Sequence, residues 1–493
     1  MKQRHLFQRG FAVWILSSAG AAARRAAAAA APRPDGGAND RGYLLYAQNC
    51  SVCHGERGRG DGPAAHLLSP KPRDFGSGRF RIVSTATRAP SVTDLMGTLR
   101  RGMPGSAMPS WNHLEDEDLF ALVEVVRELA VNGIVVDLQR EADRKGQDLT
   151  PEQAREIALT EMDPGIDFEL PHPRFRSTVG LERGRRLFLR HCADCHGREG
   201  RASSVRRQWN EDGTETRPRD FTAGIFKGGS GHDALLRRIL IGMPGSPMPA
   251  GVFERDEDAS YLASYVASLV RPGNEARSVQ TRRSLPVRRV EGAVPLAPDA
   301  AEWDAVPAEF LPLMPLWWRQ DRVEGVLWRA VHDGGRLAIR LSWEDRYEDR
   351  SVLSARGYSD AAALQFSAAP DPPLLAMGTA EQPVSIWHWK AAWEIWPRIG
   401  GGVPHVAEKL HARGFGVMEA TTSGGDEIYA KGSWAAGYWD LVFVRDLRAA
   451  DAESIELAPG SNACVGVAVW DGFAGDRNGQ KSVTIWHDLL IER

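Results

Sequence analysis

Apolar positions follow two different spacings along the chain. Between residues 40 and 272 they recur at helical spacing, with amphipathic runs at 115–129 and 256–270 that each begin with acidic residues. Beyond residue 300 apolar and polar positions alternate in short runs that Gly, Asp and Pro separate. These runs lie at 326–331, 336–343, 439–444 and 465–470. The pattern predicts helices first and an antiparallel β-sandwich after them.

The helical part contains an internal repeat, residues 40–131 and 181–272. Leu45 and Tyr46 in the first copy, like Leu187 and Phe188 in the second, predict a helix with one apolar face. Further blocks match in the same order. They are Arg41-Gly42 with Arg183-Gly184, Lys71-Pro72-Arg73-Asp74-Phe75 with Arg217-Pro218-Arg219-Asp220-Phe221, and 102–109 with 242–249. Two copies of one small helical domain are therefore expected.

A C-x-x-C-H motif stands near the start of each copy. The motifs are Cys50-Ser51-Val52-Cys53-His54 and Cys192-Ala193-Asp194-Cys195-His196. This run is the attachment signature of c-type haem: the two cysteines form thioethers and the histidine binds iron as the proximal ligand. A redox or zinc-binding cysteine pair is the alternative. The recurrence of the motif in matching surroundings favours haem.

With these motifs in order, each repeat resembles a class I cytochrome c. That family has a helix ending in C-x-x-C-H, a methionine-bearing loop and a final helix that crosses the first. The resemblance implies that Met108 and Met248, each followed by Pro, are the distal iron ligands. The alternatives are Met103 and Met243. Two protein ligands would leave neither iron an open position, which favours electron transfer over oxygen or peroxide chemistry.

Composition and charge add limits to this picture. Of the 493 residues, 43% are hydrophobic and 25% are charged, which is typical of a globular protein of two to four domains. A net charge of -3 gives no reason to expect a nucleic-acid partner. Arg73 and Arg219 of the repeats could pair with haem propionates or with their neighbouring Asp. Cys464, outside both motifs, is expected to be a buried small hydrophobe.

The N-terminus has the pattern of an export signal, predicted at 1–31. Lys2, Arg4 and Arg9 precede an apolar run at 11–23, and small residues continue to Ala31. The run is shorter than the roughly 20 residues that a spanning helix needs. Export agrees with the haem motifs, because bacterial c-type haem is attached outside the cytoplasm. A periplasmic location is expected, with membrane association only if the signal stays uncleaved.

Two segments are predicted to be linkers. Residues 132–180 are polar with a helical stretch at 151–162, and residues 273–299 are rich in Arg and Pro. Thirteen of the sixteen Trp lie beyond residue 300, where most are expected in a core. The expected fold class is multidomain: two small all-α cytochrome c domains followed by an all-β sandwich at 300–493.

Several segments of the sandwich region resemble the haem b-binding gamma subunit of ethylbenzene dehydrogenase, a family shared with dimethylsulfide dehydrogenase and with selenate and chlorate reductases. They are 363–366, Met377-Gly378, 383–391, Trp470-Asp471-Gly472 and 479–486. The resemblance implies one non-covalent haem b between Met377 and Lys481, with Lys390 as the alternative lysine. A lysine ligand must be deprotonated, so it needs a desolvated site that lowers its pKa.

These features lead to one main hypothesis, an exported electron-transfer subunit with two haem c and one haem b. By resemblance, its partners are the iron–sulfur and molybdenum subunits of an oxidoreductase of the dimethyl-sulfoxide-reductase type, and a periplasmic cytochrome or respiratory complex. The chain itself is expected to be non-catalytic. The alternatives are a dihaem acceptor with a carbohydrate- or ligand-binding sandwich, and a dehydrogenase of thiosulfate-type sulfur compounds. Loss of b-type haem on removal of Lys481 separates the main hypothesis from both.

Overall fold

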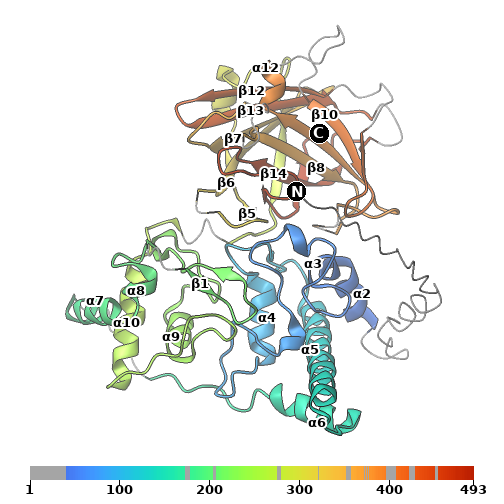
Figure 1. Cartoon of the computed structure of the whole chain (residues 1–493). Helices are drawn as coiled ribbons and strands as arrows, with labels where there is room; N and C mark the ends of the chain where they lie inside the picture. The colour runs from blue at the N-terminus through green and yellow to red at the C-terminus, as the bar shows by residue number, and fades with distance from the viewer. Residues whose placement is uncertain are drawn as a thin grey trace, which may run out of the picture.

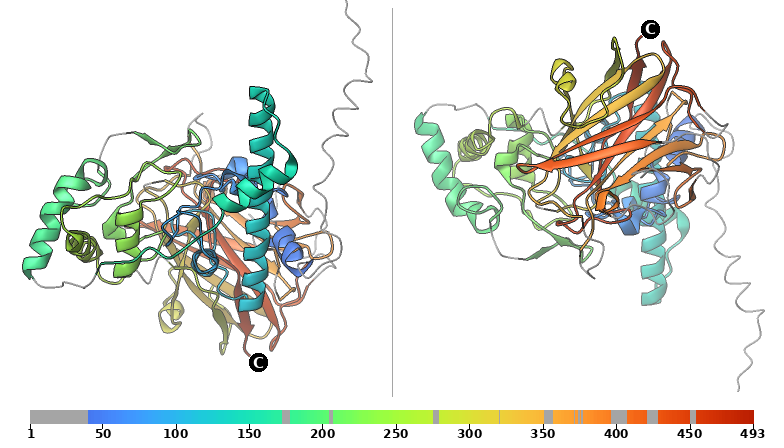
Figure 2. Two further views of the ribbon diagram at one scale, coloured as in Figure 1. Left: turned by 90° about the horizontal axis from the view of Figure 1, so that it is seen from below. Right: turned by 90° about the horizontal axis from the view of Figure 1, so that it is seen from above.

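Three bodies make up the computed structural model. Two helical bodies lie side by side beneath a large sheet domain (Figure 1). The described residues are 40–171, 178–203, 207–274, 279–319, 321–350, 357–370, 372–373, 375, 377–395, 407–420, 428–449 and 454–493. The export signal predicted at 1–31 lies outside them. Two further views show the same separation, with the second helical body to one side of the first (Figure 2).

The first helical body contains the first repeat. Its elements are α2 (Asp40–Asn49), α3 (Ser51–His54), the short helices η1 (Ala65–Leu67) and η2 (Phe75–Ser77), α4 (Val92–Arg101) and α5 (Asp116–Lys145). A capping box at Ser91 and Asp94 begins α4. An ion pair between Arg41 of α2 and Asp118 of α5 joins the first and last helices of the repeat.

The second helical body repeats this order of elements. It contains α7 (Thr178–His191), α8 (Ala193–His196), a small hairpin of β1 (Gln208–Trp209) and β2 (Glu215–Thr216), η3 (Phe221–Ala223), α9 (His232–Ile241) and α10 (Asp256–Ser268). Arg183 of α7 pairs with Asp258 of α10 at 2.5 Å, in the same place as the Arg41–Asp118 pair. The chain thus builds two helical units with matching contacts between first and last helix.

A glycine sets the crossing of α7 and α10. A Cβ added at Gly184 would lie 2.2 Å from the carbonyl oxygen of Tyr261, so the two backbones approach too closely for any side chain. Gly184 belongs to the Arg-Gly block that recurs in both copies. The structure therefore explains that block: the arginine pairs with an acid of the last helix and the glycine permits the crossing.

The segment predicted as a linker at 132–180 extends the first helical body. Helix α5 continues to Lys145, sixteen residues beyond the predicted end at 129, and α6 (Pro151–Glu161) folds back on it. Ala158 and Met162 pack into the same core cluster as Val131 and Ile134 of α5. Apolar residues of α5 thus find a cover that a polar linker would not supply.

The sheet domain is one path of strands that folds into two layers. Along the path the order is β11 (Met418–Ala420), β10 (Ala407–Ala412), β9 (Val384–Lys390), β8 (Ala361–Ser367), β14 (Asn462–Trp470), β16 (His487–Ile491), β3 (Ser284–Arg289), β6 (Gly325–His332), β7 (Arg336–Glu344), β13 (Tyr438–Asp446) and β12 (Tyr429–Ala435). Beside it lie β4 (Glu309–Pro312), β5 (Met314–Pro315) and β15 (Ser482–Val483). The short helices η4 (Ala301–Ala305) and α12 (Ala392–Ile395) connect strands.

Tryptophan side chains fill the space between the two layers. The ring of Trp389 on β9 lies 5.1 Å from that of Trp439 on β13, and Trp343 on β7 contacts both. All three are at most 1% exposed. The core therefore sits between the β9–β8–β14 half and the β6–β7–β13 half, in the arrangement of a β-sandwich.

Two details differ from the expected sandwich. Strand β3 lies inside the segment predicted as a linker at 273–299, and it pairs in parallel with both β16 and β6, so the sheet is mixed and not purely antiparallel. Leu285 and Val287 of β3 are fully buried. They alternate with polar residues and a proline in an Arg- and Pro-rich segment. Two apolar positions are too few to predict a strand from the sequence pattern there.

No helix within the described ranges is long and apolar enough to cross a membrane.

The crossing of α7 and α10 gives a direct test. We expect Gly184→Ala to destabilise the second helical body by about 1–3 kcal/mol, because the added methyl overpacks a closed contact. Gly97→Ala in α4 is the matched control, since nothing lies within 4 Å of its added Cβ and alanine favours a helix by about 0.5–1 kcal/mol. Calorimetric unfolding midpoints should fall for the first variant and not for the second.

Candidate functional site

The histidine of the first C-x-x-C-H motif is held in one orientation. Its Nδ1 donates to the carbonyl oxygen of Arg73 at 3.0 Å, and its ring stacks on Phe75 with centroids 4.6 Å apart. Because Nδ1 carries the proton, Nε2 keeps the lone pair that a metal needs. Burial lowers the pKa of His54 to about 4, so the imidazole is neutral at physiological pH.

The second motif has the same surroundings. His196 Nδ1 donates to the carbonyl oxygen of Arg219 at 3.3 Å, and its ring stacks on Phe221 at 4.3 Å. Burial also lowers the pKa of His196. The repeated block around Arg73 and Arg219 therefore has a backbone role that the sequence did not suggest: each arginine supplies the carbonyl, and the Phe two residues later supplies the stacking ring.

The methionine loops have one backbone conformation in both repeats. Met103 N–H donates to the carbonyl of Met108 at 3.1 Å, and Met243 N–H donates to that of Met248 at 3.1 Å. In each loop a serine hydroxyl donates to the carbonyl of the earlier methionine, at 2.6 and 2.7 Å. Both methionines of a pair are thereby fixed by the same turn.

A cavity in the first helical body brings the predicted haem residues together. Its empty space, including the open mouth, is about 1280 Å³. Cys50, Cys53, His54, Met103 and Met108 all line it, so the structure places both candidate methionines there. Met108 also packs against the same core cluster as Cys50.

The chemistry of the cavity fits the predicted haem c. The wall is otherwise mostly apolar, with Leu95, Leu99, Val123 and Trp111 among its residues. Burial raises the pKa of the Cys50 thiol to about 12, so the thiol is protonated. A neutral imidazole, two thiols and a thioether on an apolar wall are the groups that a covalent haem requires.

The predicted ligands of the sheet domain gather around one tryptophan. Lys481 Nζ lies 4.6 Å from the ring centroid of Trp470, and Met377 packs against the cluster of apolar residues that includes Trp470. Met377 and its neighbour Gly378 both have positive φ, +57° and +80°. A left-handed methionine is uncommon outside special sites.

The floor beneath these residues is made of small side chains. Ala363 of β8 and Ala468 of β14 belong to the Trp470 cluster, and Gly466 lies beneath the ring of Trp486. These small residues lie on neighbouring strands, on the outer face of the β8–β14 half. An apolar face beside a thioether and an amine has the chemistry that a haem needs, so these residues fit the group that the sequence predicted.

Burial distinguishes Lys481 among the lysines of this face. Desolvation lowers the pKa of Lys481 to about 8, toward the neutral amine that a metal can bind. The alternative, Lys390 at the end of β9, has its Nζ 5.1 Å from the ring of Trp393. The structure thus brings Lys481 to Trp470 and Lys390 to a different ring.

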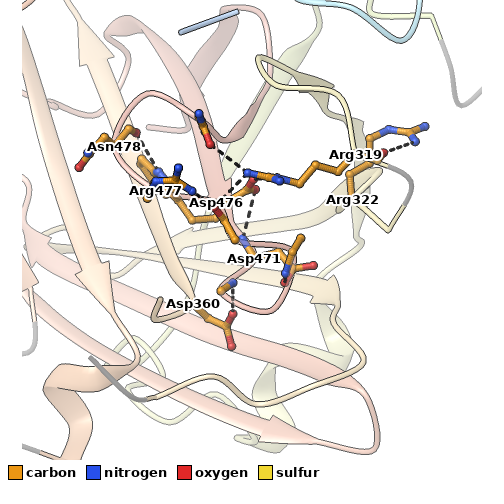
Figure 3. A network of polar contacts seen from close by, with 12 residues as sticks. Arg319, Arg322, Asp360, Asp471, Asp476, Arg477 and Asn478 are labelled. Atoms are coloured by element: carbon orange, nitrogen blue, oxygen red, sulfur yellow. Dashed lines mark hydrogen bonds and ion pairs between the residues drawn. The ribbon is translucent and has the colours of Figure 1, made fainter. Parts of the chain in front are cut away.

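A polar network holds the loop that carries Lys481. Arg319 donates to Asp476 at 2.8 Å and to the side-chain oxygen of Gln480 at 2.9 Å (Figure 3). Trp470 Nε1 donates to the carbonyl of Asn478 at 3.0 Å. These bonds tie both ends of the 471–480 loop, so they determine where Lys481 enters the sheet.

Sequence reasoning missed His388. Its ring lies 5.6 Å from that of Trp470, and its Nδ1 donates to Glu408 at 2.8 Å. Burial lowers its pKa, and both Lys390 and Lys481 lower it further. It lies within the family-like segment 383–391. Its place beside Trp470 appears only when β9 and β14 are brought to the same layer.

The first helical body and the sheet domain meet next to both candidate sites. Cys53 and Leu68 pack with Leu375 and Val483 in one apolar cluster, and Leu375 lines the haem c cavity. Leu375 precedes Met377 by two residues, and Val483 follows Lys481 by two. The cavity of the first repeat and the Trp470 face are therefore neighbours.

Comparison with known proteins finds matches in the first repeat and in the sheet domain. The cytochrome c family model matches residues 39–130, and the ethylbenzene dehydrogenase family model matches residues 404–482. The chain is 36% identical over 85 residues to cytochrome c55X of Paracoccus denitrificans. The aligned stretch covers 17% of this chain and 67% of that protein.

Two longer relatives match nearly half of the chain. One is the Haloferax mediterranei protein ORF7, whose name describes a proposed heme subunit of a respiratory nitrate reductase. It is 27% identical, and the aligned stretch covers 46% of this chain and 80% of that protein. The other is chlorate reductase subunit gamma of Ideonella dechloratans, 27% identical, covering 43% of this chain and 85% of its own.

The fold and the cavity define a cytochrome-type haem protein with a large sheet domain attached. More particularly, the chain belongs to the cytochrome c family through its first repeat, and its sheet domain is similar to the ethylbenzene dehydrogenase family over residues 404–482.

Three carboxylic acids lie close together below the Lys481 loop. Oxygens of Asp345, Asp360 and Asp471 are within 4.8 Å of one another, and these residues are at most 8% exposed. Gly472 N–H donates to Asp360 at 2.8 Å (Figure 3). Desolvation raises the pKa of each of the three, and the charge of a neighbouring carboxylate raises the pKa of Asp345 and of Asp360 further.

This cluster predicts how stability depends on pH. A carboxyl whose pKa is raised by folding holds its proton more tightly in the folded state, so its stabilisation is complete near pH 4 and is lost as pH rises through the raised pKa. We expect Asp345→Asn to flatten the fall of the unfolding midpoint with rising pH. The pKa values of His54 and His487 are both lowered to about 4, so the stability that depends on these histidines increases with pH. This contribution is the same in the wild type and the variant, so the difference between the two proteins reports the carboxyls alone.

Thermal unfolding across pH 5 to 9 measures this difference. Identical slopes for the wild type and Asp345→Asn would show that the three carboxyls titrate at ordinary values.

Proposed function

We propose that this chain is an exported electron-transfer subunit with a haem c in each helical repeat and a haem b on the sheet domain. One observation carries the proposal: Cys50, Cys53, His54 and Met108 line a single apolar cavity. The neutral, oriented imidazole and the methionine loop supply two axial ligands, which is the arrangement of an electron carrier.

The second haem c is proposed from the agreement between the repeats. His196, its carbonyl partner and its stacking ring repeat the first site, and Met248 occupies the place of Met108 in the same loop conformation. Cys192 packs against the core of its own repeat. The repeats at 40–131 and 181–272 are proposed as the two haem c units on the same grounds, with the rest of α5 and α6 packed onto the first.

The haem b is proposed from the Trp470 face. Met377 and Lys481 border this face, and burial brings the pKa of Lys481 close to physiological pH. Residues 404–482 match the ethylbenzene dehydrogenase model, which supports the same assignment. When bound, each haem would supply one-electron chemistry, and the protein contributes ligands and an apolar surround.

The proposed partners follow from the relatives. One is named for nitrate reductase and the other for chlorate reductase, so we propose that this chain serves a molybdenum oxidoreductase of that kind. The sheet domain would dock on the partner's iron–sulfur subunit, and a periplasmic cytochrome or respiratory complex would exchange electrons with the helical repeats. The chain itself is proposed to be non-catalytic, because each iron would have two protein ligands.

A periplasmic location is part of the proposal. The basic, apolar and small-residue pattern at 1–31 supports export, and covalent haem attachment requires it in bacteria.

Haem inventory tests the proposal directly. Protein expressed with its signal and the c-haem maturation machinery is extracted with acidified acetone, and pyridine haemochrome spectra are taken of both fractions. We expect two haem c to one haem b in the wild type. Lys481→Leu should lose the b-type haem and keep both c-type haems, because only the amine ligand is removed.

The matched control is Lys390→Leu, which should keep all three. Loss of haem b from Lys390→Leu in place of Lys481→Leu would transfer the ligand role to Lys390. A wild-type protein without haem b, despite ample haem supply, would refute the haem b assignment.

The axial methionine of the first repeat has its own test. We expect Met108→His to lower the midpoint potential of one haem c, because a thioether favours ferrous iron more than imidazole does. The red charge-transfer absorption of a methionine-ligated ferric haem should weaken by about half in the c-haem signal, since one of two such haems changes. Met103→Leu is the control and should change neither quantity. The reverse pattern would assign Met103 as the ligand.

A further inference from the structure

Each helical repeat donates hydrogen bonds to the matching backbone segment of the other. Arg238 of α9 donates to the carbonyl oxygens of Arg81, at 3.2 Å, and of Val83 in the first repeat. In return, Arg101 at the end of α4 donates to the carbonyl of Lys227, at 2.8 Å, in the second repeat. Arg81 and Lys227 occupy equivalent places, because each lies six residues after the Phe of its repeat, Phe75 or Phe221. Each repeat thus holds the other by the same segment.

This exchange brings a side chain of the second repeat into the haem c cavity of the first. Lys227 lines that cavity together with Arg73 and Arg81. Lys71 lines it as well, so four cationic residues from two repeats border one space. Arg219 of the second repeat donates to the carbonyl of Gly105 of the first repeat at 2.9 Å, and it lies 4.1 Å from the ring of Trp318 of the sheet domain.

Three of these cations, Lys227, Arg73 and Arg81, lack close counter-charges. In the ranges that the structure describes, no carboxylate lies within 4.0 Å of Lys227, Arg73 or Arg81, and Arg81 Nε is buried without a hydrogen-bond partner. Asp212 and Asp74 act on Arg73 only at longer range. Burial and the charges of neighbouring arginines lower the pKa of Lys227. Buried positive groups that repel one another are costly unless an anion joins them.

We propose that Lys227, with Arg73 and Arg81, binds the propionate carboxylates of the haem held by the first repeat, so that the second repeat completes the haem site of the first. The inference rests on the proposed haem c. Carboxylates are the anions that a haem brings into such a cavity, and cationic donors pair with them through charge-assisted hydrogen bonds. In this arrangement Arg73 serves the propionates and not its neighbouring Asp74.

A consequence concerns the redox balance of the first haem. A positive charge beside the haem favours the reduced iron, because reduction lowers the charge of the centre. Removing the Lys227 ammonium should therefore favour the oxidised form of the first haem and leave the second unchanged.

The experiment uses the full-length holoprotein with its haems in place. In Lys227→Gln, potentiometric titration followed by optical spectra should show the reduced-to-oxidised ratio of one haem c falling by roughly fivefold or more at a fixed ambient potential. Lys227→Arg should restore the wild-type ratio, since Arg81 is the residue at the equivalent place. Lys145→Gln, on the exposed end of α5, is the matched control and should change nothing.

A Met108→His background identifies which haem responds, because that change separates the potential of the first haem from the second. A shift of the first haem supports the proposal. Unchanged potentials with full haem content, or a shift of the second haem alone, overturn it. If Lys227→Gln does not accumulate, Arg81→Gln replaces it, with the same expected direction. Haem content of the wild type tests the proposed function separately: absence of covalent haem would refute that function and the role of Lys227 with it, whereas unchanged potentials in fully loaded Lys227→Gln would refute only the role of Lys227.

Discussion

Desolvation of basic nitrogen groups is the constraint on which the candidate sites depend. Burial keeps His54 neutral, with its pKa lowered to about 4, and it brings the pKa of Lys481 to about 8. Each group could serve as a metal ligand only because water is excluded around it. The surrounding packing is therefore part of the chemistry: Phe75 covers one group and Trp470 contacts the other.

Water is excluded around the first cavity because the two helical repeats and the sheet domain approach one another closely. Lys227 comes from the second repeat and Leu375 from the sheet domain, yet both line the cavity of the first. A cytochrome c domain alone would expose that part of its surface. The first repeat is thus the central body, in contact with both neighbours, and its cavity is completed by residues from all three parts of the chain.

The repeated block around Arg73 and Arg219 uses its backbone and its side chain for different purposes. The block containing Arg73 supplies a carbonyl for the proximal histidine and a ring that stacks on it, and the guanidinium is left to face the cavity. In the second repeat the carbonyl of Arg219 orients His196 in the same way, and the guanidinium donates to Gly105 of the first repeat. One short motif therefore orients a ligand through its main chain and places a charge through its side chain.

The sequence by itself determined the features that depend on neighbours along the chain. The C-x-x-C-H motifs, the methionine loops and the alternating strand runs are local patterns, and the first two recur in both copies of the repeat. Only the tertiary structure decided what depends on distant contacts. Strand β3 emerged from an apparent linker because β16 and β6 pair with it, and His388 joined the Trp470 face because two strands far apart in sequence lie in one layer. Lys227 reached the first cavity because the repeats exchange contacts across their interface, a relation that no local pattern encodes.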